Sequence, residues 1–147
     1  MIPGADLIWS LHLGSTWFMT GLIWLIQVVH YPLMRYALGP NFNEFHLEHS
    51  RRITWVVLPM MSLELMTGAI LFFNFQSYLG FWRCGLPLFF STMTFFGTAL
   101  FFIPLHDQLQ RGPSQNRITR LVRANRLRTL IWTVHSIFLI VSNGRVF

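Results

Sequence analysis

Four long apolar runs divide the chain, and each has the length of a helix that crosses a bilayer. A hydrocarbon core about 30 Å thick requires about 20 mostly apolar residues in helical form. The runs cover approximately residues 7–31, 53–73, 86–105 and 124–141. The sequence therefore predicts an all-α integral membrane protein, in which residues 1–147 form a single transmembrane domain and the four spans pack as a four-helix bundle.

The segment between the first two spans has a helical pattern of its own. Asn41 is a candidate N-cap, and Phe42, Phe45 and Ile53 follow it at helical spacing. Charged residues and histidines occupy many of the other positions up to Arg52, as in helices that lie in the membrane interface. We therefore expect a short interfacial helix between spans one and two.

Polar residues within the first span share one helical face. They are His12, Thr16, Thr20, Gln27 and His30, whose offsets a 3.6-residue period superimposes. Weaker stripes of the same kind occur in the third and fourth spans. Because polar groups inside a bilayer turn toward protein or water rather than lipid, these stripes predict a bundle with a polar interior.

Composition agrees with a membrane location. Hydrophobic residues make up 53% of the chain and charged residues 11%, whereas soluble domains usually carry about 25% charged residues. All eleven basic residues are Arg, and they flank the apolar runs instead of forming a soluble basic face. The lipid bilayer is therefore the expected partner, together with either subunits of a larger membrane complex or further copies of this chain, and nucleic acid is not expected.

The distribution of arginines predicts the orientation. By the positive-inside rule, the side of the membrane with more basic residues in its short loops is cytoplasmic. Both termini should then lie on the non-cytoplasmic side of a bacterial inner (cytoplasmic) membrane, with the chain crossing it four times. The Arg-rich side holds Arg35, Arg51, Arg52, Arg111, Arg117, Arg120, Arg123, Arg126 and Arg128, whereas the opposite side offers only Arg83 and Arg145.

Glu64 is the ionisable residue expected nearest the middle of the membrane. An intramembrane carboxyl group is a candidate functional group by default, as a catalytic residue, a proton relay or a metal ligand. The structural alternative is an ion pair with Arg128, or a protonated carboxyl group hydrogen-bonded to Thr20 or Thr94.

The six histidines fall into two groups by depth. Imidazole suits iron, copper and zinc, so convergence of the cytoplasmic group would make a metal site, with Gln27, Tyr31 and Asn125 orienting the ligands. Interfacial histidines are also common without any metal. The cytoplasmic group comprises His30, His46, His49 and His106.

The second group lies near the outer face. His12 of span one and His135 of span four could be the axial ligands of a haem b held between facing helices. The alternative is two interior histidines that are hydrogen-bonded separately.

Several stretches resemble a family of small uncharacterised bacterial four-helix membrane proteins. These are LIQVVHYP at 25–32, EHSRR at 48–52 with Glu64, PLHDQL and ANRLRTLIW. That family has no established activity to carry over.

The layout is more remotely similar to the HemJ-type protoporphyrinogen oxidases, four-helix membrane proteins with an essential histidine early in the first helix. His12, followed by Trp17 and Gly21, lies where that histidine would lie, and Arg52 and Pro59 resemble the opening of that family's second helix. The resemblance implies haem binding through His12. That family relies on a lysine in its third helix, and this chain contains no lysine.

Three classes of function follow from these patterns. The leading hypothesis is a membrane-embedded redox protein that binds a metal ion or haem and acts on a hydrophobic substrate. The alternative is a non-catalytic accessory subunit of a photosynthetic or respiratory membrane complex. The third is a small proton or solute transporter that uses Glu64.

Overall fold

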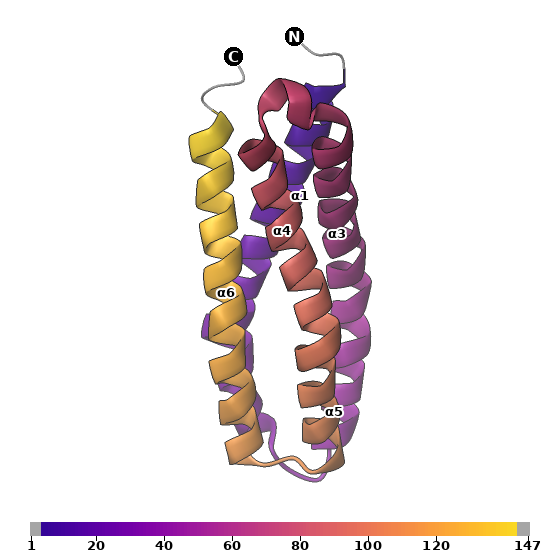
Figure 1. The fold of residues 1–147 in the computed structure, drawn as a ribbon. Coiled ribbons are helices and arrows are strands. Elements are labelled where there is room, and N and C mark those ends of the chain that lie inside the picture. Colours follow the sequence, from indigo (N-terminus) through magenta and orange to yellow (C-terminus); the bar gives the residue numbers. More distant parts are fainter. Residues whose placement is uncertain (1–3, 144–147) are drawn as a thin grey trace.

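The computed structural model describes residues 4–143, and every regular element among them is a helix. These residues form four long helical segments that lie side by side (Figure 1). The start of α1 and the end of α6 lie at one end of the molecule, which we call the terminal end. The elements are α1 (Ala5–Leu25), η1 (Ile26–His30), α2 (Tyr31–Leu33), η2 (Met34–Ala37), α3 (Phe42–Leu79), α4 (Phe81–Gly97), η3 (Thr98–Phe102), α5 (Ile103–Arg111) and α6 (Gln115–Asn143).

Three of the four segments are long and apolar enough to cross a membrane. They are Ala5–Ala37, Phe42–Leu79 and Phe81–Arg111. The first three apolar runs are thus confirmed as helices, and each helix extends beyond the run that predicted it. The fourth run lies within α6, which is long but is not among those three.

The prediction of a short interfacial helix between the first two spans is wrong. Residues 42–52 are the first turns of α3, which continues without interruption through Pro59 to Leu79. The reason is that the apolar side of these turns faces protein. Phe42 is fully buried and packs in one cluster with Leu109 of α5 and Ile118 of α6.

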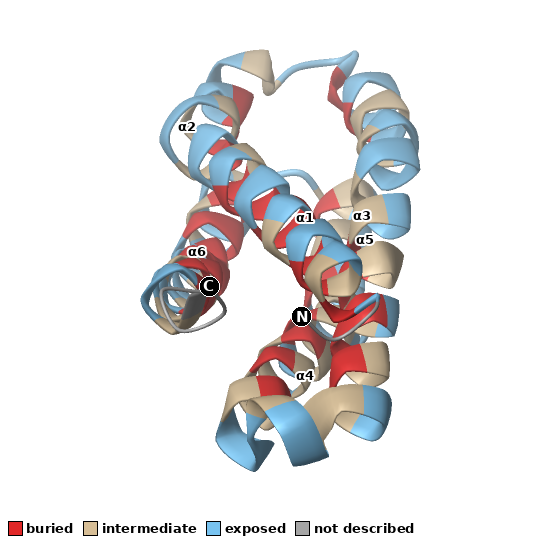
Figure 2. Cartoon of the chain, turned by 90° about the horizontal axis from the view of Figure 1, so that it is seen from above, coloured by how far each residue is buried: buried red, intermediate tan, exposed pale blue. Residues whose placement is uncertain are grey.

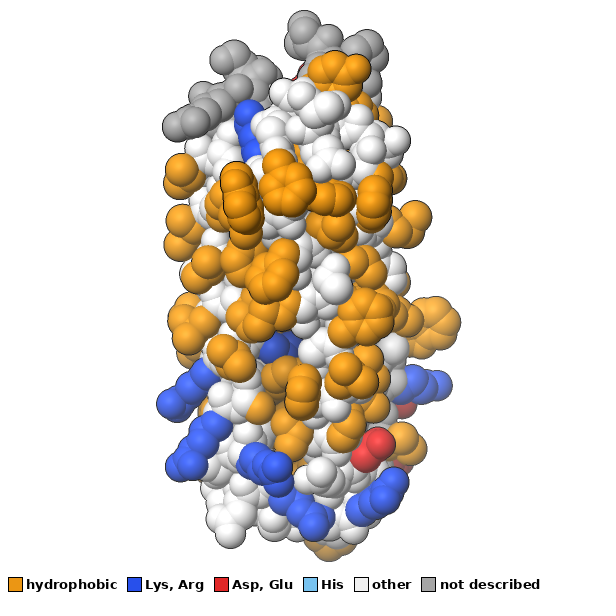
Figure 3. Space-filling model, viewed as in Figure 1, with side chains coloured by type: hydrophobic (Ala, Val, Ile, Leu, Met, Phe, Trp, Pro, Cys, Tyr) orange, Lys and Arg blue, Asp and Glu red, His pale blue; other side chains and the backbone are white. Residues whose placement is uncertain are grey.

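The end opposite the terminal end carries most of the arginines, and we call it the Arg-rich end. Figure 3 shows Arg side chains gathered around the end at which α5 and α6 are joined, below a surface dominated by apolar side chains. Arg83 lies in the first turn of α4, at the other end. Arg145, expected on that same side, lies outside the described residues.

Two π-helical turns interrupt the helices. η1 ends at His30, two residues before Pro32, and η3 ends at Phe102, two residues before Pro104. A proline lacks the N–H that closes an α-helical turn, and its ring crowds the carbonyl group four residues earlier. A wider π turn is one way in which a helix absorbs this local disruption, and such turns are frequent at functional sites.

The interior combines apolar clusters with many buried polar side chains, and the outside is mostly apolar. Figure 2 shows buried residues on the faces that the helices turn toward one another. Buried polar and charged side chains include His12, Glu64, Asn125, Arg128 and His135, whereas most large residues on the outside are apolar. The predicted polar interior is therefore present, and it consists of two regions described below.

Candidate functional site

The first region centres on Glu64, which is buried where α1, α3 and α6 meet. The Thr16 hydroxyl group donates a hydrogen bond to Oε1 of Glu64 over 3.2 Å. The Trp132 indole N–H donates to Oε2 over 3.1 Å. His135 Nδ1 lies 3.1 Å from Oε1, which is within ion-pair distance. The two atoms are not aligned for a hydrogen bond. Both carboxyl oxygens are thus occupied by protein groups.

The same region continues from His135 to a second imidazole. His135 Nε2 and His12 Nε2 are 3.3 Å apart, and His12 Nδ1 lies 2.9 Å from the Thr67 hydroxyl oxygen. We call these residues, with Thr16 and Trp132, the Glu64 network. The predicted convergence of His12 and His135 is present, and the two side chains are in direct contact.

The hydrogen-bond directions assign the protons of the Glu64 network. The Thr67 hydroxyl donates to backbone carbonyl groups of its own helix, so it accepts from His12 Nδ1–H. His12 Nε2 is then an acceptor, and His135 Nε2–H donates to it. One further proton is required between His135 Nδ1 and Glu64. The network therefore holds either an imidazolium beside a carboxylate or a neutral imidazole beside a carboxylic acid.

A haem does not fit between His12 and His135 as they lie here. Two axial histidines bind iron from opposite faces of a flat macrocycle. Here the two Nε2 atoms face each other at 3.3 Å, and no space for a macrocycle separates the rings. Haem binding stays a prediction, which the visible absorption spectrum of the purified protein would test.

The second region lies toward the Arg-rich end and contains the four predicted metal-ligand histidines. The Tyr31 hydroxyl lies 3.1 Å from His106 Nε2, His106 Nδ1 lies 3.0 Å from His46 Nε2, and His46 Nδ1 lies 2.6 Å from Gln110 Oε1. His30 stacks on His49 with ring centroids 4.1 Å apart.

These contacts occupy two of the four histidines completely. Gln110 Nε2 donates to the Asn43 carbonyl group, so its Oε1 accepts from His46 Nδ1–H. His46 Nε2 in turn accepts from His106 Nδ1–H, which leaves His106 Nε2 to accept from Tyr31. Neither ring keeps a free lone pair for a metal.

No metal-binding group was found in this arrangement. Within residues 4–143, no three His, Cys, Asp or Glu side chains are grouped so that they could hold a metal ion. Of the three residues expected to orient ligands, Tyr31 contacts His106, whereas Asn125 donates to Gln27 instead. Metal binding at His30, His46, His49 and His106 stays a prediction, which metal analysis of the purified protein would test.

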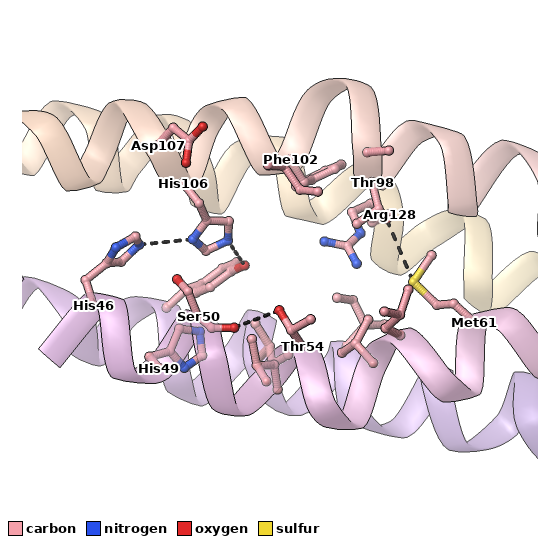
Figure 4. A pocket seen from close by; sticks show the side chains of 18 of the residues that line it. His46, His49, Ser50, Thr54, Met61, Thr98, Phe102, His106, Asp107 and Arg128 are labelled. Atoms are coloured by element: carbon pink, nitrogen blue, oxygen red, sulfur yellow. Dashed lines mark hydrogen bonds between the residues drawn. The ribbon is translucent and has the colours of Figure 1, made fainter.

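A pocket of about 360 Å³ lies beside these histidines and was not predicted from the sequence. It separates α3 from η3 and α5, and α6 contributes one side chain, Arg128 (Figure 4). The π turn η3 contributes Thr98, Ala99 and Phe102 to its wall. Proline 104, two residues beyond this turn, was the available sequence signal, but a proline does not show whether the helix bends, widens or continues.

Arg128 is buried in the wall of this pocket, with only 8% of its surface exposed. Its guanidinium carbon lies 4.3 Å from the ring centre of Phe102 and 5.2 Å from that of Trp132. Its Nε has no hydrogen-bond partner. The ion pair considered between Arg128 and Glu64 is not formed, because Trp132 contacts both groups and its indole N–H bonds to the carboxyl group.

Comparisons of this chain with protein-family models, curated proteins and solved structures find no match. The two family resemblances noted in the sequence therefore stay predictions. The functional argument rests on the geometry of the Glu64 network and of the pocket.

Proposed function

We propose that this protein spans the bilayer with four helices and binds a small amphipathic molecule in the pocket between α3 and η3–α5. The polar interior supports the first part of this proposal. Many buried polar side chains bond to one another inside the molecule, and the large residues exposed outside are mostly apolar. This distribution suits a hydrocarbon solvent, in which polar groups must be satisfied internally.

The low mean hydropathy of α6 has a local cause. Its polar residues Asn125, Arg128 and His135 face the interior, whereas its outward face carries only apolar large side chains beyond Arg126. The exposed ones are Leu127, Leu130, Val134, Ile137, Ile140 and Val141. They extend over about 21 Å of helix at 1.5 Å per residue. This face supports α6 as the fourth span.

Arginine placement supports an orientation with the Arg-rich end in the cytoplasm. Cysteine labelling in intact cells would test it, because the native Cys84 is fully buried. In intact cells, a membrane-impermeant maleimide should label Ser77→Cys, which lies in the last turn of α3. It should label Ser114→Cys, between α5 and α6, only after the cells are broken. The reverse pattern would overturn the orientation.

The pocket is the observation that carries the functional part of the proposal. Its walls are mainly apolar, and three of the residues that line it, Leu47, Leu58 and Ile103, are more than half exposed on the side of the molecule. The pocket therefore opens toward the surrounding bilayer rather than only toward water. Its volume is at the lower end of the range of about 300–1,000 Å³ typical of small-molecule sites.

Polar groups inside the pocket favour an amphipathic molecule over a plain hydrocarbon. His106, Asp107 and Arg128 line it together with apolar side chains. A few polar groups in an apolar cavity are the usual means of orienting a ligand. Redox chemistry on the bound molecule, a role as accessory subunit, and transport remain further proposals. Transport through Glu64 has the least support, because Glu64 does not line the pocket and its oxygens are occupied.

Photolabelling would test binding in the pocket. The protein in phosphatidylcholine nanodiscs would be irradiated with twelve-carbon diazirine probes that end in either a hydroxyl or a carboxyl group, and the labelled peptides sequenced. Label from at least one probe should concentrate on residues 53–61 and 95–103. Even labelling of all exposed apolar helix faces by both probes would overturn the proposal.

Two neighbouring substitutions provide the matched control for this experiment. Ala99 lines the pocket, whereas Leu100 is exposed and does not line it. Ala99→Phe should fill the pocket and remove the concentrated label, and Leu100→Phe should leave it unchanged.

A further inference from the structure

We infer that the molecule bound in the pocket carries an acidic head group, a carboxylate or a phosphate, on a single apolar tail, and that Arg128 binds this head. The inference rests on the proposed function and adds the chemical class of the ligand. Three properties of the pocket support it: the charge of Arg128, the atoms that Arg128 leaves without partners, and the location of Asp107, the acidic residue that lines the pocket.

Arg128 brings an unbalanced positive charge into an apolar surrounding. Among the described residues, the ion pairs join Glu48 to Arg51 and Arg52, and Glu64 to His135, and none includes Arg128. Leaving a buried charge without a partner destabilises a protein by several kcal/mol. An anion in the pocket would supply the missing charge.

The guanidinium group is held in place and keeps hydrogen-bond donors available. Its contacts to Phe102 and Trp132 are to ring faces, which leave the N–H groups at its edge free to donate. Nε, within that edge, has no partner. Trp132 is fixed in turn by its bond to Glu64. The planar edge of a guanidinium matches the two oxygens of a carboxylate or phosphate.

Asp107 does not balance this charge. It lines the same pocket, but its side chain is exposed, and Figure 4 shows it beside His106 and separated from Arg128 by Phe102. The Ser50 hydroxyl also lines the pocket and is buried without a partner, so it is a second group free to bond to an oxygen-rich head.

A neutral head group fits these observations less well than an acid. A ketone, quinone or alcohol could accept a hydrogen bond from Arg128, but its dipole would leave the guanidinium charge uncompensated in a medium of low dielectric constant. A charged partner gives a stronger hydrogen bond and removes that imbalance. The tail would then leave the pocket past the exposed side chains of Leu58 and Ile103, which face the bilayer.

Competition between matched ligands would test the inference on the unmodified protein. The carboxylate photoprobe would be displaced from the pocket by dodecanoate, dodecyl phosphate or dodecanol. One acid or both should compete about tenfold or more better than dodecanol, because a charged acceptor forms a stronger hydrogen bond with the guanidinium group. The ranking of the two acids would distinguish a fatty acid from a phosphate-bearing lipid.

Three variants complete the test, two of which remove one positive charge from the same helix. Arg128→Gln should remove the preference for acids while dodecanol competes as before, and Arg128→Lys should restore part of the preference. Arg126→Gln, on the exposed side of the same helix, should leave it unchanged.

The outcomes separate the inference from the proposed function. If alcohol and acid occupy the pocket equally in the unmodified protein, the acidic head group is wrong and the pocket stands. If neither occupies it, the proposed function itself fails. A preference for acids that persists in Arg128→Gln would also overturn the assignment of Arg128.

Discussion

The two polar regions of this protein contain similar side chains but are completed in different ways. In the Glu64 network, a carboxyl group, two imidazoles, an indole and two hydroxyl groups contact one another, and the one buried atom without a hydrogen bond, His135 Nδ1, lies 3.1 Å from the carboxyl group. In the region near the Arg-rich end, two histidines are satisfied, but Arg128, Ser50 and His30 each keep a buried polar atom without a hydrogen-bond partner.

This difference indicates which region is structural and which is available to a ligand. Buried polar groups that satisfy one another rigidify a protein and fix how its helices pack. Buried polar groups without partners are costly, and a water, an ion or a ligand is one explanation for them. Both regions lie inside the same apolar exterior. Removing a bonded group from the Glu64 network should therefore lower the free energy of unfolding, whereas replacing the unpaired Arg128 with an apolar residue should raise it.

The largest effect is expected from removing the carboxyl group of Glu64. Glu64→Leu should lower the free energy of unfolding by about 3–5 kcal/mol, because His135, Trp132 and Thr16 would lose their partner inside an apolar interior. Unfolding by sodium dodecyl sulfate in mixed micelles, followed by circular dichroism, would measure it. Glu64→Gln should be milder because its amide oxygen still accepts a bond. A loss below 1 kcal/mol for the leucine variant would show that the network is not structural.

An intermediate effect is expected from Gln110, which joins α5 to α3. Its side chain accepts from His46 and donates to the Asn43 carbonyl group. Gln110→Ala should therefore lower the unfolding free energy by about 1–2 kcal/mol. It should also speed amide hydrogen exchange in α5 more than in α4. Gln108→Ala, exposed on the same helix, is the control, and equal exchange in both variants would contradict the role assigned to Gln110.

A smaller effect of opposite sign is expected at Arg128. Arg128→Met should raise the unfolding free energy of the ligand-free protein by about 1 kcal/mol, because an apolar side chain replaces an unpaired buried charge, and lost ring contacts offset part of the gain. Excess dodecanoate should stabilise the unmodified protein and not the variant. If Arg128→Met is as damaging as Glu64→Leu, Arg128 belongs to a completed network and the contrast between the regions fails.

No measurable change in stability is expected at Glu48. Its ion pairs with Arg51 and Arg52 are on the exposed side of α3, where water and salt screen charges. Glu48→Gln should unfold at the same detergent concentration as the unmodified protein. A clear loss would show that this turn of α3 contacts a partner in the preparation.

The sequence predicted the helices and the polar interior better than it predicted which polar groups meet. Run lengths and the stripe through His12 and Thr16 follow from one helix at a time, so they could be predicted. Contacts between helices depend on how each helix is rotated about its axis. For that reason the pair His12–His135 was predicted but its direct contact was not.

Glu64 and Arg128 illustrate the same limit. An ion pair between them was one alternative considered from the sequence, and it is not formed. Trp132 lies one turn beyond Arg128 on the same face of α6, and it reaches the carboxyl group first. Thr16, which also bonds to Glu64, was on the predicted stripe but was not selected, because Thr20 and Thr94 are equally plausible from spacing alone.

The π turn at η3 sets the rotational phase of everything that follows it on α5. A π turn contains one more residue than an α-helical turn, and each residue advances the helix by about 100°. If residues 98–102 formed an ordinary α-helix with every residue retained, α5 would turn by about that angle and His106 would point away from His46. Deleting Ala99 would instead remove the extra residue, and a regular α-helix would then keep His106 in its present direction. The width of the turn at η3 therefore determines which side chain of α5 meets His46.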